Sequence, residues 1–207
     1  MISFFKLLLG RLRYPWPRRA IVQRLRPLRI SRCPKERIAE LWHLYEQNMP
    51  HGLPPDEDGH YREALQSDNP MIFLAEEGGR LVGTFGLSYE AEANHHWLSY
   101  LLVAPEDHRR GVGTTLLLAS IALLPKARTP QFLCISAVPT ALGFYHRFGF
   151  RTGGEWQHSS GLLLPLQYLA LVPEMGESCW HWLVTVGATL PILTEDIPKT
   201  APQAATP

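Results

Sequence analysis

The chain contains little cysteine, and this excludes two classes of small protein. Its 207 residues include three cysteines, Cys33, Cys134 and Cys179. Their odd number, their wide spacing and the lack of a Cys-x-x-Cys pair argue against a disulfide framework and against a zinc knuckle. We therefore predict no metal site and a reducing compartment, with Cys134 as a core residue of an apolar strand.

Acidic residues are missing from positions 1–35, which hold ten of the 20 lysines and arginines. Residues 36–207 then carry ten bases against 19 acids, so a basic arm precedes an acidic body. A basic arm suits a phosphate-rich surface, whereas an acidic body favours cationic small molecules. Because only the arm is basic, nucleic acid is a disfavoured partner.

The N-terminus also lacks an apolar run long enough to cross a bilayer, because Lys6 interrupts it and no small-residue cleavage site follows. The spacing instead predicts an amphipathic helix that ends before Pro15, with one apolar face formed by Phe5, Leu8, Leu9 and Leu12. Residues 1–24 are thus predicted to be an anchor on an anionic membrane or a mitochondrial presequence. A solvated arm or a helix docked on the domain is the alternative. The predicted location is cytoplasmic, at a membrane surface where the arm anchors the chain.

The rest of the chain alternates between strand and helix patterns. The predicted strands are 25–31, the two arms of a hairpin over 71–90, 96–105, 131–138, 151–159 and 164–173. The predicted helices are 35–49, 61–67, 112–124 and a short one within 139–150. We expect one α/β domain over 25–172 and an extension over 173–207. The first half of the extension is predicted to pack on the domain or on a partner, and its last ten residues to be disordered.

The stretch EDHRRGVGTTLLLASIALL, residues 106–124, places two arginines and two glycines directly before a helix that is apolar on nearly every face. Such a helix is expected to be buried against a sheet. Its first N–H groups have no intrahelical partner and carry partial positive charge, so they can bind an anion where no side chain blocks the approach. Gly111 and Gly113 leave that approach open, and Arg109 and Arg110 add charge. The sequence is neither a P-loop nor a dinucleotide fingerprint, and we expect it to hold a pyrophosphate.

Two segments together are similar to a known family. LLVAPEDHRRGVGTTLL, followed about thirty residues later by ALGFYHRFGF, resembles the Gcn5-related N-acetyltransferase (GNAT) superfamily. The resemblance covers residues 25–172 in element order. It implies an α+β fold with a mixed, mostly antiparallel central sheet flanked by helices, whose central strands splay at the cofactor site. It also implies acetyl-CoA as cosubstrate.

The resemblance assigns residues by position. Pyrophosphate binding is expected from the backbone amides of His108, Arg109, Arg110, Gly111, Val112, Gly113 and Thr114, and pantetheine binding from Leu101, Leu102 and Val103. Tyr145 matches the tyrosine that protonates the departing CoA thiolate in many members. Two positions depart from the family pattern: His108 replaces Gln or Arg, and Val138 replaces an asparagine that often contacts the cofactor.

The predicted activity is acyl-CoA-dependent N-acylation, with acetyl passing directly to a primary amine. This chemistry needs a base, an oxyanion donor and a proton for the thiolate. We predict the Val103 N–H as oxyanion donor, Tyr145 as acid, and His96 or Glu90 as base. Further candidates are His95 and Glu92, and either glutamate could instead bind a cationic acceptor.

Several partner and function assignments remain open from the residues alone. The acceptor is predicted to be a small molecule or a peptide amine, and a homodimer is a further predicted assembly. The alternative function is a catalytically weak CoA-binding or regulatory module that is tethered through the basic arm.

Overall fold

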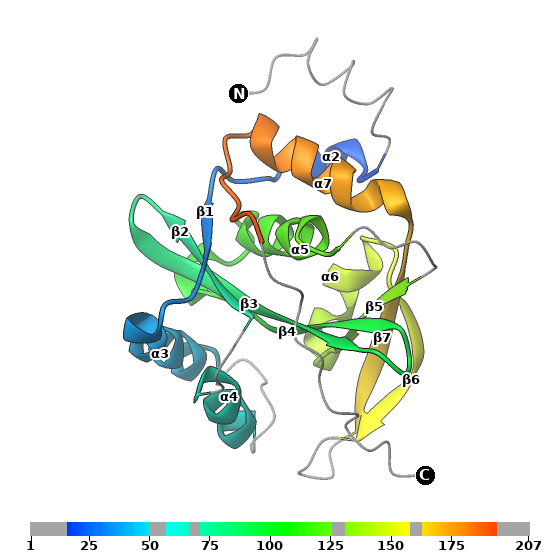
Figure 1. Ribbon diagram of the computed structural model, residues 1–207, viewed down its shortest axis with the longest axis horizontal. Helices are drawn as coiled ribbons and strands as arrows, with labels where there is room; N and C mark the ends of the chain where they lie inside the picture. The colour runs from blue at the N-terminus through cyan, green and yellow to red at the C-terminus, as the bar shows by residue number, and fades with distance from the viewer. Residues whose placement is uncertain (1–15, 50–56, 67–70, 126–130, 158–162, 194–207) are drawn as a thin grey trace.

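The computed structural model describes residues 16–49, 57–66, 71–125, 131–157 and 163–193, and its central feature is one seven-stranded sheet (Figure 1). The predicted amphipathic stripe at residues 5–12 and the last ten residues lie outside this described part.

The sheet has the strand order β1-β2-β3-β4-β5-β7-β6. Its strands are β1 Arg29–Arg32, β2 Ile72–Glu77, β3 Arg80–Glu90, β4 His95–Val103, β5 Gln131–Ser136, β6 Arg151–Gln157 and β7 Leu163–Leu171. Neighbouring strands pair antiparallel except β4 and β5, which are parallel. The predicted mixed and mostly antiparallel sheet is therefore confirmed.

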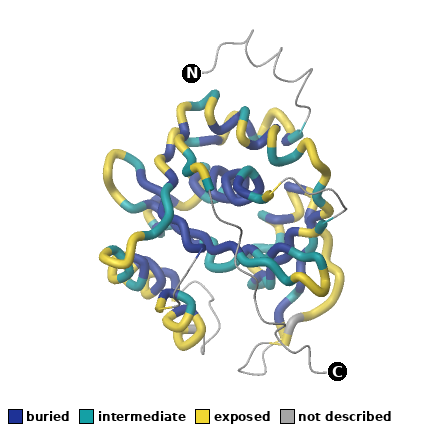
Figure 2. Tube along the Cα trace, in the orientation of Figure 1, coloured by how far each residue is buried: buried dark blue, intermediate teal, exposed yellow. Residues whose placement is uncertain are grey.

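Helices cover both faces of this sheet (Figure 1). They are α2 Arg19–Val22, α3 Ile38–Asn48, α4 Glu57–Gln66, α5 Val112–Ala122, α6 Leu142–His146 and α7 Pro173–Thr185. One face bears α3 and α4, while α5, α6 and α7 lie on the other, where α5 is placed between the sheet and α7. Figure 2 shows α5 buried along almost its whole length. Because α7 covers its outer side, α5 can be apolar all round.

Both ends of the described chain belong to the core on the α5 face. Val22 and Leu25 from the N-terminal segment, and Trp182 and Leu183 from α7, are buried in it. After α7, the chain pairs with the start of β1, where the Ile30 N–H donates to the Thr189 carbonyl at 2.8 Å. The predicted C-terminal extension thus packs on the domain as far as residue 193.

The parallel strands β4 and β5 separate part-way along their length. They pair from His95 opposite Phe132 to Trp97 opposite Cys134. Further along, β4 stays paired with β3, and the register shifts between Ser99 and Leu102. Tyr100, inside this bulge, has a φ of +50°. A bulge bends its strand, so the predicted splay of the central strands is confirmed.

Two predicted elements differ most from the structure in where they begin. The strand predicted over 25–31 is confined to Arg29–Arg32, because Leu25 and Leu28 are buried from the connection after α2 rather than from a strand. The helix predicted over 61–67 begins at Glu57. Its residues 58–60 are polar or glycine and exposed, so they carry no apolar periodicity.

Candidate active site

The turn between β4 and α5 presents unpaired backbone N–H groups. The first intrahelical hydrogen bond of α5 runs from the Thr115 N–H to the Gly111 carbonyl, at 3.0 Å. The N–H groups of Val112, Gly113 and Thr114 therefore have no acceptor inside the helix. Arg109 is exposed beside them and has a φ of +61°. This donor set fits the pyrophosphate of CoA, which the turn would hold by its backbone.

A buried carboxylate braces this turn. The Asp107 side chain is fully buried and accepts hydrogen bonds from Arg80 Nη2 at 2.7 Å and from Arg110 Nη1 at 2.8 Å. Of the two predicted arginines, Arg110 is thus engaged in holding the turn, and the structure gives Arg109 no such ion pair among the described residues.

The N-terminal segment packs directly against the same turn. Gly111 has a φ of +95°, and a Cβ at this position would lie 1.9 Å from the Arg24 carbonyl oxygen. Nearby, the Arg26 N–H donates to Thr115 Oγ1 at 2.9 Å. A Cβ at Gly113 would make only ordinary contacts, at 3.6 Å from Val103 and 3.8 Å from Phe144. Packing therefore requires glycine at 111 but not at 113.

At the end of β4, the backbone of Val103 points toward the gap that opens where β4 and β5 stop pairing. The Ala104 N–H donates to the Val82 carbonyl on β3, and donor directions alternate along a strand. Leu102 therefore points its backbone groups toward β3, and Val103 points its own away from β3. Two side chains, Asn48 Nδ2 at 3.1 Å and His108 Nε2 at 3.0 Å, approach the Val103 carbonyl oxygen.

Tyr145 lies on α6 next to this region. Its side chain is 4% exposed, and the structure gives its hydroxyl no hydrogen-bond partner among the described residues. Burial raises the pKa of the phenol, so Tyr145 is protonated at neutral pH, as a general acid must be. The neighbouring Phe144 lies beside Gly113, which places this part of α6 near the start of α5.

Glu90 lies at the end of β3, two residues beyond Ser88, which is the residue opposite the last pair of β4 and β5. The register places it opposite His95, on the sheet face that bears α3 and α4. Its Oε2 accepts a hydrogen bond from Trp97 Nε1 at 2.9 Å. Trp97 and Cys134 form the last pair between the parting strands and mark the vertex of the gap, which the carboxylate contacts through the Trp97 indole.

His96 faces the opposite side of the sheet. It is 1% exposed, and its cross-strand neighbours Tyr89 and Leu133 pack into the core beneath α5. Its Nε2 is 2.9 Å from Gln131 Oε1, and its Nδ1 is buried without a hydrogen-bond partner among the described residues. Burial lowers the pKa of this imidazole, against a smaller opposing effect of the Gln131 hydrogen bond.

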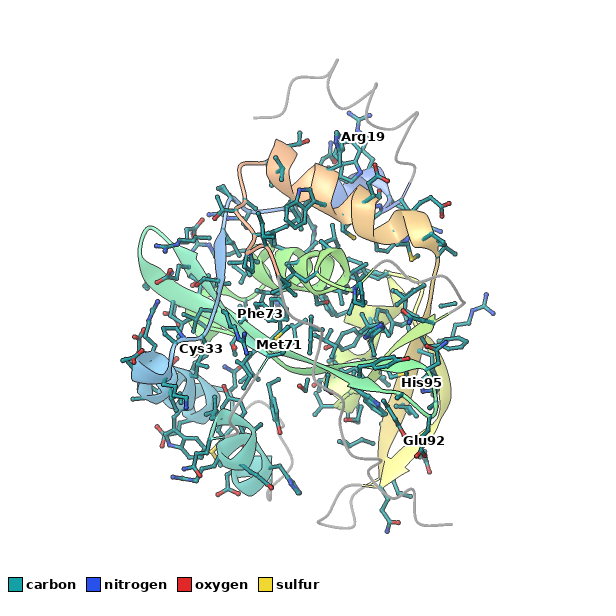
Figure 3. The ribbon with its side chains drawn as sticks, in the orientation of Figure 1. Arg19, Cys33, Met71, Phe73, Glu92 and His95 are labelled. Carbon is teal, nitrogen blue, oxygen red and sulfur yellow. The ribbon has the colours of Figure 1, made fainter. Side chains whose placement is uncertain are left out.

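The two further candidates for the base, His95 and Glu92, have different surroundings. His95 packs edge-on against Phe132, with ring centroids 5.4 Å apart. Glu92 is exposed in the turn between β3 and β4. Figure 3 shows both at the outer end of this hairpin. The structure thus gathers Glu90 and His95 on one face and separates them from His96.

Comparison with known proteins agrees with this arrangement. The acetyltransferase (GNAT) family matches residues 38–150, which is more than half of the chain. The chain belongs to the GNAT family. Acetyl-CoA is accordingly its cosubstrate, and acetyl transfer is the general activity of this GNAT protein.

Solved structures share the fold at low sequence identity. The ribosomal-protein-S18-alanine N-acetyltransferase of Escherichia coli is 17% identical, with a TM-score of 0.53, covering 69% of this chain and 93% of that one. The PaiA N-acetyltransferase of Thermoplasma acidophilum, solved with coenzyme A, is 15% identical, with a TM-score of 0.55 and coverages of 70% and 99%. An acetyltransferase of Thermus thermophilus is 21% identical, with a TM-score of 0.55 and coverages of 71% and 98%. No curated protein matches the chain.

Two kinds of feature are absent from the described residues. These residues contain no helix that is both long and apolar enough to cross a membrane. They also contain no group of three or more histidine, cysteine or acidic side chains that could hold a metal ion.

Sequence reasoning missed three residues that shape the GNAT cofactor turn. Asp107 stands three positions before Arg110, and this spacing, which suits an ion pair, could have indicated its role from sequence. Asn48 and Arg24 contact the turn from segments distant in sequence, and no local pattern marks either of them.

Proposed function

We propose that this GNAT protein transfers acetyl from acetyl-CoA to a primary amine by direct attack. One observation carries the proposal: the gap between β4 and β5 leads from the unpaired amides of α5 to Trp97, whose indole donates a hydrogen bond to the Glu90 carboxylate. From Val103 to Trp97, β4 covers about 20 Å at the rise of a β-strand. An extended pantetheine arm has a similar length, so the gap suits a cofactor that places its thioester near Glu90.

The residues around the gap supply the groups that acyl transfer needs. Attack by the neutral amine forms the C–N bond, breaks the C–S bond and releases one proton from nitrogen. We assign the Val103 N–H to the pantetheine arm rather than to the developing oxyanion, because its backbone points away from β3 but it lies about 20 Å along β4 from the proposed thioester position. We assign Tyr145 as the acid that protonates the leaving thiolate, since its phenol is buried and protonated.

We assign Glu90 to the acceptor amine in preference to His96. A carboxylate beside the vertex can bind the ammonium form and accept the proton that it loses. His96 is almost completely buried on the opposite face, and a solvent-borne amine has no direct access to it. A role of His96 as base stays a prediction that the variants below separate from that of Glu90.

Steady-state thiol release from acetyl-CoA with a panel of primary amines tests the proposed function. We expect amine-dependent turnover in the wild type, a loss of at least about 100-fold in Glu90→Gln, and a smaller loss in His96→Gln. CoA binding without turnover for every amine would instead support the regulatory-module alternative. A larger loss in His96→Gln than in Glu90→Gln would reverse the assignment of the base.

We further propose that the basic arm attaches the protein to an anionic membrane surface. Arg18, Arg19 and Arg24 are exposed, while Val22 between them is anchored in the core. Figure 3 shows Arg19 beside α7, at the end of the molecule where the described chain begins. Basic side chains held at one end of an acidic body favour contact with anionic lipid.

A further inference from the structure

The half-buried carboxylate of Glu90 has no cationic partner among the described residues. Glu76 pairs with Arg37, Glu77 with Arg26, and the nearby buried Asp107 with two arginines. Glu90 forms no ion pair with any described residue, and only its Oε2 accepts a hydrogen bond. A half-buried carboxylate without a counter-charge is costly unless a cation approaches it.

Aromatic rings surround this carboxylate on the same sheet face. The Trp97 indole donates to it, and cross-strand pairing places Tyr168 on β7 opposite Cys134, next to the vertex. The pKa of the Cys134 thiol is raised to about 12, mainly by burial and further by the charge of Glu90. Burial and the same charge also raise the pKa of Tyr168.

Three neighbouring rings, those of His95, Phe132 and Tyr168, form a ring wall on this sheet face. The ring centroids of His95 and Phe132 are 5.4 Å apart, those of His95 and Tyr168 5.9 Å, and those of Phe132 and Tyr168 6.2 Å. These residues come from three adjacent strands, and Phe132 remains 37% exposed. Arg151, opposite Tyr168 on the edge strand β6, is three strand spacings from β4, about 14 Å away.

We infer that the acceptor is a monocationic amine with an apolar, preferably aromatic, body. Its ammonium group binds between the Glu90 carboxylate and the Trp97 ring, and its body lies against the rings of His95, Phe132 and Tyr168. The chemistry is that of an ion pair combined with cation–π contact, and the ring wall adds apolar burial. The inference rests on the proposed function, because it names the acceptor class of the same site.

The charges and positions of these side chains together favour a monocationic aromatic amine over other amine acceptors. A dication such as putrescine would place its second charge against the ring wall, where the described contacts are those of aromatic rings rather than of a second carboxylate. An amino acid such as glutamate would bring carboxylates toward Glu90, and like charges repel. A short alkylamine would satisfy Glu90 but leave the rings uncovered.

Calorimetry on the CoA-loaded full-length protein tests the inference with 2-phenylethylamine, ethylamine, putrescine and glutamate. We expect 2-phenylethylamine to bind about 10- to 100-fold more tightly than ethylamine, the gain for burying one aromatic side chain. Glu90→Gln should weaken both monoamines by at least about 10-fold. Tyr168→Leu should weaken only 2-phenylethylamine. Glu174→Gln, which removes an exposed carboxylate on α7, is the matched control and should change neither.

The outcomes separate this inference from the proposed function. Equal affinity for ethylamine and 2-phenylethylamine, tighter binding of putrescine, or unchanged binding in Glu90→Gln would each overturn the inference. CoA titration of every variant shows whether its fold and cofactor turn are intact. A wild-type protein that binds CoA but not 2-phenylethylamine would overturn the inference alone, whereas failure to bind CoA would overturn the proposed function.

Discussion

Replacing Gly111 by alanine should unfold the cofactor turn rather than only block the cofactor. The φ of +95° would be strained for alanine, at a cost of about 1–2 kcal/mol. The new Cβ would also lie 1.9 Å from the Arg24 carbonyl oxygen, so the N-terminal segment must move. That movement breaks the hydrogen bond from the Arg26 N–H to Thr115, which contributes about 1 kcal/mol.

The total loss depends on how far the segment moves. Strain and the lost hydrogen bond together predict a decrease of at least about 2 kcal/mol in the free energy of unfolding. If Val22 leaves the core as well, the loss rises to about 5 kcal/mol, because a fully buried valine contributes about 1.5–3 kcal/mol. Denaturant unfolding followed by circular dichroism measures this as a lower midpoint.

Gly113→Ala is the matched control for Gly111→Ala. Its Cβ would make ordinary contacts, and alanine is favoured over glycine inside a helix by about 1 kcal/mol. We therefore expect an unchanged or higher midpoint, together with weaker CoA binding in calorimetry, since the methyl group enters the row of unpaired amides. A wild-type midpoint for Gly111→Ala would refute the packing argument. Wild-type CoA affinity for Gly113→Ala would refute the amide cradle.

Three further predictions concern the acid, the buried histidine and the arm. Tyr145→Phe should lower turnover by about 100- to 10,000-fold with CoA affinity unchanged, and wild-type thiol release would leave the tyrosine as a core residue only. Because burial lowers the pKa of His96 below its unfolded value of 6.5, the unfolded state binds the extra proton first. Stability should therefore fall as pH decreases below about 6.5, by no more than about 1.4 kcal/mol per pH unit for one group. His96→Gln should flatten this slope in thermal melts across pH 5–7, and an unchanged slope in this variant would contradict the lowered pKa of His96. Anionic vesicles should sediment the full chain at low salt but not at about 1 M, where the Debye length is about 3 Å. Deleting residues 1–15 should reduce this sedimentation, and equal sedimentation of the shortened chain would exclude the arm as the anchor.

Part of the basic arm is packed on the domain, and this limits which residues can be deleted in the vesicle experiment. The arm was predicted over residues 1–24 from its charge and its apolar helical spacing, which suggests deleting all of it. Val22 is buried in the core, and Arg24 contacts Gly111, so a deletion to residue 24 would also damage the cofactor turn. Charge composition along a chain does not report which residues of a basic segment are anchored by packing.

The acceptor face illustrates a similar limit. Strand alternation is readable from sequence, yet the choice between His96 and Glu90 as base, with His95 and Glu92 as further candidates, stayed open until the register was known. A shift of one residue moves a side chain to the other face of a sheet, and register depends on pairing with strands far along the chain. The structure places Glu90 and His95 on the sheet face that bears α3 and α4, and His96 in the core beneath α5.

The sequence by itself determined the family, the order of strands and helices, and the cofactor turn. Each of these depends on neighbouring residues: apolar periodicity, and glycines at the start of a helix. Only the tertiary structure decided which groups meet at the vertex of the gap, why Gly111 must be glycine, and that α7 completes the core around α5. These features join residues that are distant along the chain. Their contact depends on strand register and helix packing, which local sequence patterns do not specify.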